Sequence, residues 1–88
     1  MRYKKPTAVR VLIVEDEPAL SEHLARAIGT AGYAVDTAAD GERADFAVRT
    51  ESYDAVLLDL GLPRIDGLTL LRGWRESGLR VPVLVLTA

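Results

Sequence analysis

Cysteine is missing from this sequence, which excludes disulfide bonds and thiolate metal sites. Histidine occurs once, as His23, and its place in a helical pattern predicts a surface residue that is neither ligand nor catalyst. A large charge of one sign is lacking too: the formal net charge of −2 favours neither a nucleic-acid nor a membrane surface. No apolar run approaches the roughly 20 residues that cross a bilayer, and no signal peptide is recognisable. We therefore expect a cytoplasmic protein.

What is present is the pattern of one small globular domain, with 49% hydrophobic residues in a chain of 88. Apolar segments with the character of strands cover residues 9–14, 33–38, 55–59 and 81–86. Segments with helical spacing lie between them, at residues 18–31, 41–50 and 67–77. We expect Phe46 and Ala47 to make apolar contacts in the second helix. The alternation of strands and helices predicts an α/β fold with a doubly wound parallel sheet.

The two ends of the sequence differ in character. Residues 1–8 contain several basic residues without periodicity, and we interpret them as a flexible N-terminal arm before a domain at residues 9–88. The last segment is a strand of buried type, with no helix after it. A parallel sheet needs helices on both faces, and three helices are few for that purpose. We therefore expect the C-terminal part of the domain to be absent.

Acidic residues follow two of the predicted strands. The first strand ends at Glu15 and Asp16, and the third ends at Asp59. In a doubly wound sheet these strands are neighbours, so their carboxyl ends would bring three carboxylates to one pocket. Mg²⁺ would relieve their repulsion, and the backbone carbonyl of Gly61 could add a ligand. With the hydroxyl of Thr87 beside it, such a site could support aspartyl-phosphate chemistry.

Four motifs give the sequence a family resemblance. They are Val-Glu-Asp-Glu-Pro at 14–18, Leu-Leu-Asp-Leu-Gly-Leu-Pro at 57–63, Asp-Gly at 66–67 and Leu-Thr-Ala at 86–88. At these spacings the chain resembles the receiver domain of two-component response regulators, in register from about residue 9 to residue 88. The resemblance implies the flavodoxin-like receiver fold and a phosphorylation-dependent switch rather than an enzyme. Such a domain catalyses only its own phosphotransfer and dephosphorylation.

The resemblance also implies a role for each site residue. Asp59 resembles the phosphoacceptor, which takes a phosphoryl group from the histidine of a sensor kinase. Asp16 resembles the acidic Mg²⁺ ligand, and Glu15 its partner acting through water. Gly61 would offer its backbone carbonyl to the metal. Thr87 resembles the switch hydroxyl that moves to bind the phosphoryl oxygens.

Parts of the family pattern lie beyond this sequence. The family lysine and the aromatic switch residue belong to a fifth strand, and the fourth and fifth helices form the usual signalling and dimer face. The sequence around Asp59 is similar to that of regulators that carry a C-terminal winged-helix DNA-binding domain. This similarity implies control of transcription, a receiver homodimer in the full-length protein, and DNA contact only through that other domain.

Three other functions fit parts of the pattern. A Mg²⁺-dependent phosphatase with an aspartate nucleophile would need a general acid two residues after Asp59, where Gly61 cannot transfer a proton. A nucleotide- or flavin-binding domain would need a phosphate cradle after the first strand, where acidic residues repel phosphate. A degenerate or stand-alone receiver that only binds partners is the third alternative, and the intact acids argue against it.

Overall fold

The computed structural model of the chain describes residues 8–86. The arm predicted for residues 1–8 lies almost entirely outside this range, and so does Thr87. The elements follow one another in the predicted order: β1 (Arg10–Val14), α1 (Pro18–Thr30), β2 (Ala34–Ala38), α2 (Gly41–Thr50), β3 (Ala55–Asp59), α3 (Gly67–Glu76) and β4 (Val83–Leu86).

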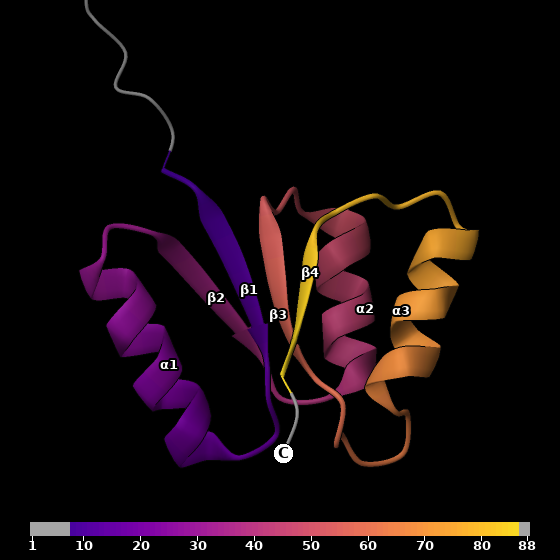
Figure 1. Ribbon diagram of the computed structural model, residues 1–88, viewed down its shortest axis with the longest axis horizontal. Coiled ribbons are helices and arrows are strands. Elements are labelled where there is room, and N and C mark those ends of the chain that lie inside the picture. Colours follow the sequence, from indigo (N-terminus) through magenta and orange to yellow (C-terminus); the bar gives the residue numbers. More distant parts are fainter. Residues whose placement is uncertain (1–7, 87–88) are drawn as a thin grey trace, which may run out of the picture.

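The strands form one parallel sheet in the order β2-β1-β3-β4. The chain runs outward from β1 to β2 and then returns to the other side of β1, so β1 and β3 are neighbours. Figure 1 shows α1 on one face of this sheet and α2 with α3 on the other. The predicted doubly wound α/β receiver fold is confirmed for the elements that the chain contains.

The hydrophobic core lies between the sheet and the α2–α3 layer. Trp74 of α3 and Leu58 of β3 are fully buried in it. The other face carries Val11 and Ile13, which are also buried and point away from this core. Helix α1 covers that face without burying any of its own residues completely. Beyond α1 the same face is open, and Leu84 of β4 is 57% exposed.

Short polar side chains begin two of the helices, as predicted. Asp40 accepts a hydrogen bond from the amide of Arg43 at the start of α2, and Asp66 accepts one from Thr69 at the start of α3. The turns after α1 and α3 use glycines with positive φ, Gly32 and Gly78. In the described part of the chain, no helix is long and apolar enough to span a membrane.

Two details of the prediction were wrong. The last strand begins at Val83 instead of residue 81, because Pro82 has no N–H to donate to a sheet. Phe46 is 70% exposed and makes no core contact in α2. The buried stripe of that helix is Gly41, Ala44 and Val48. Phe46 lies two residues from Ala44, and two residues turn a helix by about 200°, to its opposite side.

Candidate functional site

The sheet topology brings the acidic residues to one edge. Strands β1 and β3 pair in parallel, with Val14 beside Leu58. The residue that follows each of them is acidic: Glu15 comes directly after β1, and Asp59 is the last residue of β3. This edge is the carboxyl end of the sheet at the point where strand order reverses, which is where open α/β sheets bind ligands. The predicted adjacency of the two strands is confirmed.

The carboxylates of Glu15, Asp16 and Asp59 form one cluster. One oxygen of each lies within 4.8 Å of an oxygen of both others. Glu15 is buried, Asp59 is half-buried and Asp16 is exposed. The cluster is thus anchored on the inner side and open to solvent on the outer side. An open cavity of about 420 Å³ lies over it, lined also by Glu17, Pro18, Leu20 and Leu86.

Backbone amides orient two of these carboxylates. The amide of Glu17 donates to Oε2 of Glu15 at 3.1 Å, and the amide of Gly61 donates to Oδ1 of Asp59 at 3.0 Å. Burial raises the pKa of Glu15 above its ordinary value, and the nearby charge of Asp59 adds to the rise, while the Glu17 amide opposes it. A positive ion would offset both the cost of burying the charge of Glu15 and its repulsion by Asp59.

The third acid after β1, Glu17, has a different role, which was not assigned to it from the sequence. Its side chain accepts hydrogen bonds from the amides of Ala19 and Leu20 at 3.0 and 3.2 Å, so it caps the N-terminus of α1. Its charge therefore meets the positive end of the helix dipole. The signal was present, because Glu17 stands immediately before Pro18, a residue that favours the first helical turn. Two of the three consecutive acids remain for the pocket.

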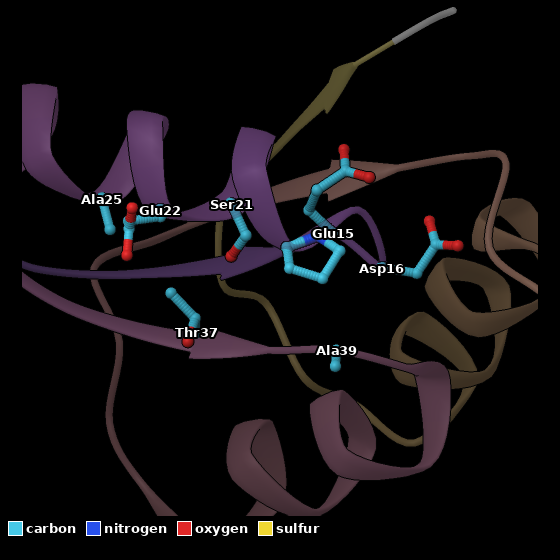
Figure 2. Close-up of a pocket in the computed structure, with 8 residues that line it drawn as sticks. Glu15, Asp16, Ser21, Glu22, Ala25, Thr37 and Ala39 are labelled. Atoms are coloured by element: carbon cyan, nitrogen blue, oxygen red, sulfur yellow. The ribbon is translucent and has the colours of Figure 1, made fainter.

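A second cavity adjoins the cluster, between α1 and the end of β2. It measures about 430 Å³, and Glu15 and Asp16 lie at one end of it. Figure 2 shows its two walls: Ser21, Glu22 and Ala25 from α1 on one side, and Thr37 and Ala39 from the end of β2 on the other. The acidic cluster therefore borders two cavities, this one between α1 and β2 and the one lined by Asp59 and Leu86.

The turn from β3 to α3 carries Gly61 and is tied to α2. Arg64 has a positive φ of 68°, and its guanidinium lies 3.8 Å from a carboxylate oxygen of Asp40 and 4.0 Å from one of Glu42. Ile65 packs against Gly41, the first residue of α2. These contacts place the turn beside the start of α2.

The donors at this edge suit a hard divalent cation. Carboxylate oxygens with some solvent access match the preference of Mg²⁺, which binds one or two carboxylates and retains several waters. Of the predicted site residues, the structure brings Glu15, Asp16 and Asp59 together and places Gly61 in the turn two residues after Asp59. Thr87 falls outside the described residues.

The family model described as "Response regulator receiver domain" matches residues 11–88. The chain belongs to this family. The receiver fold that the four motifs implied is therefore shown by the family match as well as by the sheet topology.

Curated relatives include transcriptional regulators. Transcriptional regulatory protein PhoP of Escherichia coli is 46% identical over 80 residues, which are 91% of this chain and 36% of that protein. Virulence transcriptional regulatory protein PhoP of Salmonella typhimurium matches with the same identity and coverage. The chain spans about a third of the length of these relatives.

Solved structures share the architecture. The receiver domain of the Francisella response regulator 1452 superposes with a TM-score of 0.88 at 29% identity, over 91% of this chain and 66% of that one. The response regulator TrrA from Thermotoga maritima, solved in complex with Mg²⁺-BeF, gives 0.86 at 36% identity, over 91% of this chain and 70% of the other.

Proposed function

We propose that this receiver domain accepts a phosphoryl group on Asp59, with Mg²⁺ as cofactor, and acts as a phosphorylation-dependent switch. The observation that carries the proposal is the cluster of Glu15, Asp16 and Asp59 at the carboxyl ends of β1 and β3. Membership of the receiver family supports it and implies a sensor histidine kinase as the phosphoryl donor. The response regulator TrrA, solved in complex with Mg²⁺-BeF, supports Mg²⁺ as the cofactor.

The burial and hydrogen bonds of the three acids suit them to different roles. Glu15, Asp16, Asp59 and the carbonyl of Gly61 would hold Mg²⁺, with Glu15 acting through water. When bound, the metal supplies positive charge that offsets the negative charge of the incoming phosphoryl oxygens. Glu15 is buried and held by the Glu17 amide, so it suits a fixed carboxylate that acts through water rather than a nucleophile. Asp16 is exposed and suits a direct contact with a solvated ion.

Asp59 suits the role of nucleophile. It is half-buried at the end of β3, and the Gly61 amide fixes one of its oxygens, Oδ1, which orients the other. A carboxylate oxygen attacks phosphorus, an O–P bond forms, and the N–P bond of the kinase phosphohistidine breaks. The electron pair of that bond stays on the histidine nitrogen, which takes a proton from solvent. The product is an acyl phosphate on Asp59.

Phosphorylation changes the charge of this edge. It adds roughly −1.5 to −2 charge and three acceptor oxygens, to which the hydroxyl of Thr87 would bind in the active state. In this proposal the shift is read by a DNA-binding domain that controls transcription, and the similarity to the transcriptional regulatory protein PhoP supports this part. A receiver homodimer in the cytoplasm completes the proposal. The chain would catalyse its own phosphotransfer and dephosphorylation and no other reaction.

Intact-mass spectrometry tests the proposal. The chain is incubated with Mg²⁺ and a small phosphodonor, and the expected product is one phosphoryl adduct. Asp59→Asn and a sample with EDTA in place of Mg²⁺ should give none. Asp54→Asn is the matched control, because Asp54 lies at the opposite end of β3, bonded to the backbone of Arg10; this variant should form the adduct. An adduct that persists in Asp59→Asn would refute the assignment.

A further inference from the structure

We infer that Gly67 is a positioning residue for the phosphoacceptor and its metal, and that no other residue can fill this place without displacing them. Gly67 is buried as the first residue of α3. A Cβ built there would lie 2.9 Å from the carbonyl oxygen of Asp59, 2.9 Å from Cα of Leu60 and 2.9 Å from Cδ2 of Leu60. The inference rests on the proposed function.

The nature of the three contacts decides their consequence. Cδ2 of Leu60 belongs to a side chain that can turn aside. The other two atoms belong to the backbone, which can move only if the end of β3 or the start of α3 moves. Contacts of this length are far inside the van der Waals distance of about 3.5–4.0 Å. A methyl group at residue 67 would therefore separate α3 from the segment that carries Asp59.

That segment also carries the proposed metal ligands. The amide of Gly67 donates to the carbonyl of Leu60 at 3.4 Å, which closes the turn around Gly61. On its other side the turn is held by Ile65 against Gly41. A displacement at residue 67 cannot be absorbed there without losing this packing, so it passes to Asp59 and Gly61.

The test is the dissociation constant of Mg²⁺ for Gly67→Ala, measured by calorimetric titration on the 88-residue chain. Replacing a residue that orients metal ligands typically weakens metal affinity 10–100-fold, so we expect the dissociation constant to rise roughly tenfold. Gly73→Ala is the matched control. It lies on the same helix, and apart from its chain neighbours and the backbone of that helix no atom lies within 4 Å of its added Cβ, so the constant should stay unchanged.

A second variant separates side-chain strain from backbone strain. Leu60→Ala removes the flexible contact, so Leu60→Ala with Gly67→Ala keeps only the two backbone contacts. This double variant should still bind Mg²⁺ about tenfold more weakly than Leu60→Ala alone. It also serves if Gly67→Ala alone does not fold, with a stabilising osmolyte in every sample.

The outcomes are distinct. Equal constants for the double variant and Leu60→Ala would overturn the inference, as would a Gly67→Ala variant that is less stable but binds Mg²⁺ normally. If the unaltered chain binds no Mg²⁺, the proposed function fails instead. A weaker constant in Gly67→Ala and in the double variant, with Gly73→Ala unchanged, is the result that supports it.

Discussion

Asp45 is predicted to stabilise the contact between α2 and α3 through the one tryptophan of the chain. Trp74 is fully buried, and its indole N–H donates to Oδ1 of Asp45 at 2.9 Å. Asp45→Ala would leave this donor without its partner, which typically costs 1–3 kcal/mol for a buried group. The carboxylate of Asp45 is 39% exposed, so water can reach the vacated place and reduce the loss. We therefore expect Asp45→Ala to lower the free energy of unfolding by about 1–2 kcal/mol.

Urea unfolding followed by circular dichroism measures this change. Asp45→Asn keeps an oxygen acceptor and should lose clearly less than Asp45→Ala. A double-mutant cycle with Trp74→Phe isolates the pair, because in that background there is no indole N–H to satisfy and Asp45→Ala should cost little. A loss of the same size with tryptophan and with phenylalanine at position 74 would refute the reasoning.

Two further predictions concern titratable groups. Burial and the 2.6 Å hydrogen bond to Asp36 raise the pKa of Tyr53 to about 12. The contribution of this bond to stability is therefore complete below the ordinary tyrosine pKa of about 10, and it is lost as pH rises toward 12. The difference in unfolding free energy between the chain and Tyr53→Phe should shrink across that window, and a constant difference would contradict it. Burial, and after it the charge of Asp59, raises the pKa of Glu15, so its carboxylate destabilises the metal-free chain. Glu15→Gln should therefore raise the urea midpoint of unfolding in EDTA while weakening Mg²⁺ binding. A lower midpoint in EDTA would count against this.

The order of the elements could be predicted because it depends on local features. Apolar segments of strand length, helical spacing between them, and cap residues such as Asp40 and Asp66 each act within a few positions of the chain. The two wrong predictions depended on the side of a helix to which a residue points and on one missing N–H donor. Phe46 is apolar, but it lies across the helix from the stripe that packs, and Pro82 delays β4.

The carboxylate cluster was predictable for a different reason. Parallel strands bring their carboxyl ends to one edge, so the residues after β1 and β3 had to meet there once the strand order was known. The division of labour among the acids was only partly predictable: Pro18 marks Glu17 as a cap, but which carboxylate reaches which amide depends on the folded chain. Glu17 caps α1 while Glu15 turns inward, and the close approach of Gly67 to Asp59 depends on how α3 packs.

The most direct test of the account is to locate the phosphoryl group. After reaction with Mg²⁺ and the small phosphodonor, borohydride reduces an acyl phosphate to an alcohol, which converts a phosphorylated aspartate to homoserine. Peptide mapping then reads the position. We expect homoserine at residue 59 only when Mg²⁺ was present, and unchanged aspartate at residue 16 in every sample. Homoserine at another position, or at residue 59 without Mg²⁺, would contradict it.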